Sequence, residues 1–95
     1  MDFELFKKSL DRAEPPADIS AHLRSLWYDA KGDWEQSHEI IQHIGDAHAS
    51  WIHAYLHRKE GDNGNADYWY HKAGRKRPSI TLDQEWRDIA GTLLK

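Results

Sequence analysis

The sequence predicts an all-α protein, with five to six short helices packed as antiparallel hairpins. Apolar residues recur at intervals of three and four along six successive segments, which is the period of an amphipathic helix. No segment alternates between apolar and polar residues as a half-buried strand does. The chain also contains no valine, although sheets draw heavily on valine, isoleucine and threonine. These observations favour helices throughout and leave no segment for a sheet.

The first two segments each carry one apolar face. The first covers residues 2–13 and ends before Pro15-Pro16. Its apolar residues are Phe3, Phe6 and Leu10. The second begins after Asp18 or Ser20, either of which is a suitable N-cap, and Gly32 ends it. Its apolar face consists of Ile19, Leu23, Leu26, Trp27 and Ala30.

The third and fourth segments each begin at an aspartate and are separated by Gly45. Asp33 precedes the third segment, with Gln36 three residues later at capping-box spacing. Its apolar face consists of Ser37, Ile40, Ile41 and Ile44. Asp46 precedes the fourth, whose bulky side carries His48, Trp51, Ile52, Tyr55 and Leu56. Its other side carries the small residues Ala47, Ser50 and Ala54. Small residues let a second helix approach closely, so we expect the fourth helix to lie between two others.

The last two segments follow the loop that begins at Gly61. We expect Gly61 to adopt a left-handed backbone conformation as the C-cap of the fourth helix. The fifth helix is predicted over about residues 65–73, with Asn63 or Asn65 as its N-cap. Thr81 and Gln84 form a capping-box pattern before the sixth, at residues 82–94. The apolar face of the sixth helix consists of Leu82, Trp86, Ile89, Ala90 and Leu93.

Length and composition limit the class of protein. Ninety-five residues correspond to a single domain, 1–95, in which a pair of hairpins at about 19–73 is flanked by helices 2–13 and 82–94. The 13 basic and 16 acidic residues give a net charge of −3, which argues against general binding to nucleic acids or anionic membranes. No apolar run approaches the length of a membrane span, and the first residues lack the pattern of a signal peptide. With no cysteine, the chain fits a cytoplasmic location.

Two turns of the same type stand 29 residues apart. Gly32-Asp33 and Gly61-Asp62 each follow a predicted helix and precede a small residue on the next helix, Ser37 or Ala66. A helix, a tight turn and a second helix form the unit of helical-repeat proteins. The positions Gly61, Ala66, Tyr70, Ala73 and Pro78 resemble the second half of a tetratricopeptide or Sel1-type repeat. This resemblance covers about half of the chain, has a shorter period than that family, and implies TPR-like packing.

A longer string of residues carries a second resemblance. Residues 51–62 read Trp-Ile-His-Ala-Tyr-Leu-His-Arg-Lys-Glu-Gly-Asp, and residues 65–70 read Asn-Ala-Asp-Tyr-Trp-Tyr, followed by Ala73-Gly74. This string is similar to one found in a family of small, mainly bacterial, helical proteins. The resemblance implies no activity, since none is assigned to that family.

His53 and His57 form the main candidate site. They are four residues apart on one predicted helix, the spacing at which two imidazoles can hold one ion, and Glu60, Asp62 or His71 could supply a third ligand. We expect both rings at the rim of a groove. The candidate ligand-binding residues are His53, His57, Arg58, Glu60 and Tyr68. The alternatives are that the two histidines belong to an ordinary helix surface, form hydrogen bonds with the loop 61–65, or contact a partner.

Other patterns do not specify chemistry. His38 and His43 are five residues apart, so their directions diverge by about 140° on an ideal helix and they cannot share an ion. Glu35 and His38 have the Glu-x-x-His spacing of di-iron bundles, but no second copy exists. We find no phosphate-binding loop, dinucleotide motif or catalytic triad pattern, so the sequence specifies neither catalytic residues nor a cofactor.

These observations support two hypotheses of different classes. The first is a non-enzymatic protein- or peptide-interaction module. The second is a small-ligand or metal-binding protein, with catalysis left open, whose site is centred on His53 and His57. Residues 1–47 carry 10 acids and 5 bases, and residues 48–95 carry 6 acids and 8 bases. This asymmetry could orient either a partner protein or a second copy of the chain in a homodimer.

Overall fold

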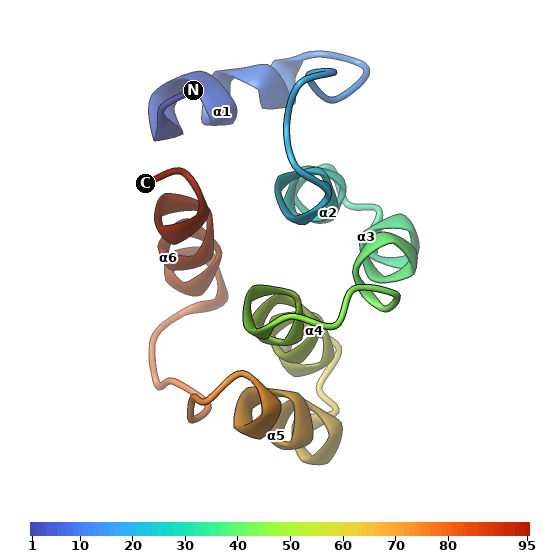
Figure 1. The fold of residues 1–95 in the computed structure, drawn as a ribbon, viewed down its shortest axis with the longest axis vertical. Coiled ribbons are helices and arrows are strands. Elements are labelled where there is room, and N and C mark those ends of the chain that lie inside the picture. Colours follow the sequence, from blue (N-terminus) through green and yellow to red (C-terminus); the bar gives the residue numbers. More distant parts are fainter.

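The computed structural model describes all of residues 1–95 and confirms the all-α prediction. The chain forms six α-helices and one short 3₁₀ helix, with no strand (Figure 1). In chain order these are α1 (Phe3–Lys8), η1 (Ser9–Asp11), α2 (Ala21–Ala30), α3 (Trp34–Ile41), α4 (Ala47–Lys59), α5 (Asn63–Lys72) and α6 (Leu82–Leu93). None of these helices has both the length and the apolar character that a bilayer crossing requires.

The N-terminus of every α-helix is capped by the side chain of the residue that precedes it. The N-caps are Asp2, Ser20, Asp33, Asp46, Asp62 and Thr81, and each accepts a hydrogen bond from the backbone N–H three residues later. At α6 the predicted capping box with Gln84 is present. The predicted cap of the fifth helix was wrong. The carboxylate of Asp62 takes this role, so α5 starts at Asn63 and includes Gly64 in its first turn.

Two other boundaries differ from the prediction. The α-helical part of the first segment is only Phe3–Lys8, and the tighter turn Ser9–Asp11 continues it. Helix α3 ends at Ile41, before the expected stop at Gly45, so Ile44 lies outside the helix while still packing against the core. Helix ends commonly tighten or fray by one or two residues, which limits boundary predictions from sequence patterns.

The chain folds into two consecutive hairpins, α2–α3 and α4–α5, with matching turns. Gly32 and Gly61 both have φ of +86°, which confirms the left-handed conformation predicted for Gly61. The next residue donates its backbone N–H back to the preceding helix in both turns, from Asp33 to Tyr28 and from Asp62 to His57. TPR-like packing of the hairpins stays a prediction.

Helix α4 lies at the centre of the molecule. Figure 1 shows α2, α3, α5 and α6 arranged around it, and α4 contacts all four. Every residue from Ala49 to His57 is buried. The predicted position between two other helices is therefore confirmed. The small side chains of Ser50 and Ala54 are both buried and allow this close approach.

Helix α6 closes the core against α1 and α2. The Trp86 ring stacks on Phe6 with centroids 5.8 Å apart, and Phe3 meets the same ring edge-on. The indole N–H of Trp86 donates to the backbone carbonyl of Leu26 at 3.0 Å. One side chain therefore joins the first, second and last helices.

We expect Trp86→Ala to lower the free energy of unfolding by about 3–5 kcal/mol, because it leaves a cavity between three helices and removes the hydrogen bond to Leu26. Urea denaturation measures this change. Asp88→Ala, an exposed substitution on the same helix, is the control and should change stability by no more than about 0.5 kcal/mol. Equal stability of Trp86→Ala and wild type would contradict the packing described for α6.

Candidate metal centre

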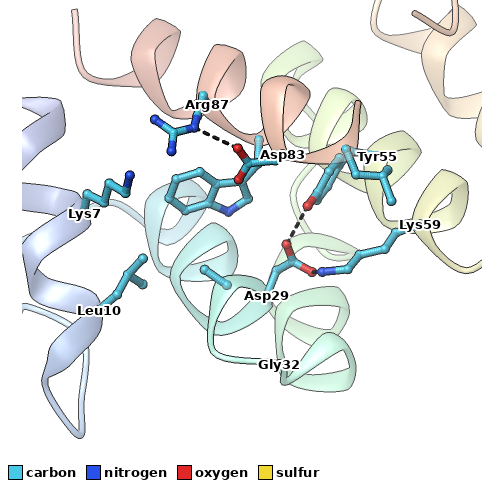
Figure 2. A pocket seen from close by; sticks show the side chains of 11 residues that line it. Lys7, Leu10, Asp29, Gly32, Tyr55, Lys59, Asp83 and Arg87 are labelled. Carbon is cyan, nitrogen blue, oxygen red and sulfur yellow. Dashed lines mark hydrogen bonds and ion pairs between the residues drawn. The ribbon is translucent and has the colours of Figure 1, made fainter. Parts of the chain in front are cut away.

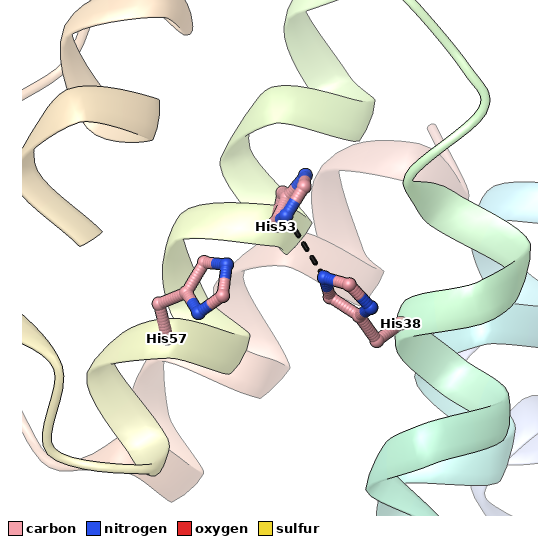
Figure 3. Close-up of side chains that lie close together, drawn as sticks. All are labelled: His38, His53 and His57. Atoms are coloured by element: carbon pink, nitrogen blue, oxygen red, sulfur yellow. Dashed lines mark hydrogen bonds between the residues drawn. The ribbon is translucent and has the colours of Figure 1, made fainter. Parts of the chain in front are cut away.

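Three histidine side chains from two helices meet between the hairpins (Figure 3). His38 comes from α3, and His53 and His57 come from successive turns of α4. The Nε2 atoms of His38 and His53 are 3.1 Å apart, and one nitrogen from each of the three rings lies within 4.8 Å of the others. His53 and His57 are buried, with exposed fractions of 6% and 7%, and His38 is half-buried.

The three imidazole rings are brought together by their spacing on α4 and by the packing of α3 against α4. The i, i+4 spacing puts His53 and His57 on one face of α4, with ring centroids 4.8 Å apart. Helix α3 packs against α4, and the Trp34 indole N–H donates to the Leu56 carbonyl at 2.9 Å. This bond fixes the start of α3 on α4, and His38 lies one turn further along α3.

Two tryptophan rings hold the imidazoles in position. Trp69 of α5 stacks on His53 with centroids 3.9 Å apart and an interplanar angle of 14°. Trp34 stacks on His38 at 4.9 Å and 8°. These contacts cover one face of the His38 ring and one face of the His53 ring, while the Nε2 atoms of the two rings approach each other. The arrangement fixes ring planes before any ligand binds.

A carboxylate sets the tautomer of His57. Its Nδ1 lies 2.6 Å from Oε1 of Glu60, so Nδ1–H donates to this carboxylate, also when the ring is neutral. The lone pair is then on Nε2, where the amide nitrogen of Asn65 approaches at 3.4 Å. A histidine that donates its second N–H to a carboxylate is the common arrangement behind metal-bound imidazoles.

The surroundings favour the neutral forms of His38 and His53. Burial, together with the nearby rings of His38 and His57, lowers the pKa of His53 from 6.5 to about 4. Burial also lowers the pKa of His38, and His57 adds to this effect while Glu60 and Glu39 oppose it. Neutral imidazoles offer lone pairs, which metal ions need and protons would otherwise occupy.

The donor set fits a transition metal. Imidazole nitrogens suit Zn²⁺, Cu²⁺, Ni²⁺ and related ions, whereas Mg²⁺ and Ca²⁺ prefer oxygen ligands. Tetrahedral zinc holds two nitrogens at about 2.0–2.1 Å each, which places them about 3.3 Å from one another. The Nε2 atoms of His38 and His53 are already close to this separation, and the hydrogen bond that joins them would be replaced by bonds to the ion.

The predicted site residues divide between different parts of the molecule. His53, His57 and Glu60 come together, but the two histidines are buried between helices and not at the rim of an open groove. Arg58 turns away and pairs with Glu85 at 2.8 Å. Tyr68 is 57% exposed, as expected for the outward member of its aromatic run, and it contacts Trp69 edge-on.

The third ligand also differs from the sequence expectation. His71 is exposed on α5 and does not join the cluster, whereas His38 does. In the sequence, His38 stands out only by its spacing to Glu35 and His43, and neither spacing indicates α4 as its neighbour. Glu60 and Asp62 form a second group with His57, in which both carboxylates are exposed.

Comparison with protein-family models, with curated proteins and with solved structures finds no match to this chain. The resemblances noted in the sequence therefore stay predictions. The geometry of the three histidines does not depend on these resemblances.

The metal-free protein should lose stability as the pH falls from about 6.5 to about 4. In this range the unfolded chain protonates the residue-53 imidazole but the folded chain does not, so the unfolded state binds more protons and is favoured at lower pH. One such group contributes up to about 1.4 kcal/mol per pH unit to the free energy of unfolding. Urea titrations of chelator-treated protein at several pH values measure the slope.

His53→Gln removes the ionisable group, so the slope of the variant should be smaller than that of wild type across the same window. Carboxylates that titrate below about pH 5 affect both proteins and cancel in this comparison. Equal slopes would show that His53 keeps its ordinary pKa in the fold.

Proposed function

We propose that this protein binds a divalent transition-metal ion through His38, His53 and His57. The observation that carries the proposal is the convergence of three imidazoles from two helices, with a nitrogen from each within 4.8 Å of the others. Three protein ligands leave a fourth position on a tetrahedral ion for water or another small ligand.

The surroundings of the histidines support an ion over an organic molecule. None of the clefts on the surface is lined by His38, His53 or His57. The space near the rings is instead filled by the two tryptophans that stack on them. An apolar shell with a carboxylate behind one ligand is typical of metal sites, because it excludes water and raises ligand basicity.

A metal at this position would join the two hairpins. His38 belongs to α2–α3, and His53 and His57 belong to α4–α5. An ion held by both therefore adds a link across the interface between hairpins. Because binding favours the folded state, the ion should also raise the melting temperature, by an amount that grows with the ratio of free metal to dissociation constant.

Isothermal titration with Zn²⁺ should give one ion per chain, and Co²⁺ should give the visible absorption bands of a tetrahedral or five-coordinate ion. His38→Ala and His53→Ala each remove a ligand and should weaken Zn²⁺ binding by about 100-fold or more. Glu60→Gln removes only the partner of His57 and should weaken binding by about 10–100-fold.

The matched controls are His48→Ala and His71→Ala, which alter exposed histidines outside the cluster and should leave affinity unchanged. Far-UV circular dichroism confirms that each variant is folded before titration. Zn²⁺ affinity that is equal in wild type and His38→Ala would contradict the proposal, as would loss of affinity in the controls alone.

We also propose, as a second candidate, a protein-interaction role in which α5 contacts the partner. Tyr68 favours this role because it is an aromatic side chain more than half exposed, and tyrosines are enriched at the centres of interfaces. A second copy of the chain is the simplest partner to examine, by sedimentation of wild type and Tyr68→Ser. Self-association that Tyr68→Ser abolishes supports this role, and a monomer at all concentrations argues against a homodimer.

A further inference from the structure

A separate cleft of about 430 Å³ lies where α1, α2, α4 and α6 meet (Figure 2). Its volume is within the range of small-molecule sites, which is about 300–1,000 Å³. None of its lining residues belongs to the histidine cluster. Figure 2 shows Lys7 and Leu10 on one side of the cleft, with Tyr55, Lys59 and Asp29 on the other.

Part of the cleft wall is apolar. Leu10 comes from η1, Leu82 from the start of α6 and Trp86 from the next turn of α6. The Trp86 ring is fixed from behind by its stack on Phe6 and by its hydrogen bond to Leu26. This part of the wall is therefore a rigid surface suited to a ring or a short hydrocarbon chain.

Both carboxylates in the cleft have an ion-pair partner, whereas one of the cations does not. Asp29 is buried and accepts hydrogen bonds from Lys59 at 2.9 Å and from the Tyr55 hydroxyl at 2.8 Å. Asp83 pairs with Arg87 at 3.0 Å. Both carboxylates thus have cationic partners, so the cleft offers no free anion to a positively charged ligand.

Lys7 is the cation of this cleft without an ion-pair partner. Glu4 and Asp11 line a neighbouring cleft with Lys7, but neither lies within ion-pairing distance of it. Lys59 keeps further N–H donors after its bond to Asp29. The cleft therefore combines an apolar wall with an excess of positive charge.

We propose that this cleft binds a small organic anion that has an apolar body and one carboxylate. The body packs on Trp86 between Leu10 and Leu82, and the carboxylate accepts hydrogen bonds from Lys7. A single negative charge matches the one unpaired ammonium group. This site is independent of the metal centre, so either proposal can fail without affecting the other.

Phenylpropionate is a suitable probe, because it has an aromatic ring, a short linker and one carboxylate. We expect it to shift the Trp86 indole N–H resonance in ¹H–¹⁵N spectra, with a dissociation constant of about 1 mM, as is reasonable for a ligand of this size. The neutral analogue phenylpropanol should bind about tenfold more weakly, and the cation phenylpropylamine should not shift this resonance.

Lys7→Gln should weaken phenylpropionate binding by about tenfold and leave phenylpropanol binding unchanged. Lys8→Gln is the matched control, because Lys8 is exposed and adjacent in sequence but does not line the cleft. The proposal is overturned if the acid and the alcohol bind equally, if both lysine variants lose the same affinity, or if the Trp86 resonance does not move.

Discussion

The burial of α4 on every side is the constraint on which the rest of the structure depends. From Ala49 to His57 every residue is buried, although this run contains Ser50, Trp51, His53 and Tyr55. A buried polar group without a hydrogen-bond partner is costly, so the surrounding helices must supply partners. No buried side-chain nitrogen or oxygen in the molecule lacks a hydrogen bond. Many residues outside α4 are therefore explained by what α4 places in the core.

Two buried carboxylates accept hydrogen bonds from several of the polar side chains on and around α4. Glu85 of α6 is 1% exposed and accepts hydrogen bonds from three side chains, Trp51, Arg58 and Tyr70. Asp29 of α2 does the same for Tyr55 and Lys59. A buried charge is tolerated only when it is paired and hydrogen-bonded, and both carboxylates meet this condition. The histidine cluster meets the cost of burial in another way. Burial lowers the pKa of His53, so the neutral ring, which has a nitrogen lone pair, is favoured.

The sequence predicts local features well because local chemistry determines them. The capping box at Thr81 and the left-handed Gly61 depend on residues within one turn, and both are present as expected. The i, i+4 spacing likewise predicts that His53 and His57 lie together, but no local pattern predicts the position of His38, because that position depends on how α3 packs against α4. Nor does any local pattern predict the hydrogen bond from Arg58 to Glu85, which is 27 residues later in the chain. Periodicity identifies the buried face of a helix without identifying the helix that covers it.

The position of α6 has a consequence for the order of folding. The hairpins α2–α3 and α4–α5 join segments adjacent in the chain, whereas Trp86 bonds to a carbonyl 60 residues earlier. Closing a long loop costs more entropy than closing a short one, so local hairpins should form first and α6 should dock afterwards. Until it docks, the donors of Trp51, Arg58 and Tyr70 have no Glu85 carboxylate. Helix α6 therefore completes the core, and a chain in which it has not yet docked holds two hairpins with these polar side chains unpaired.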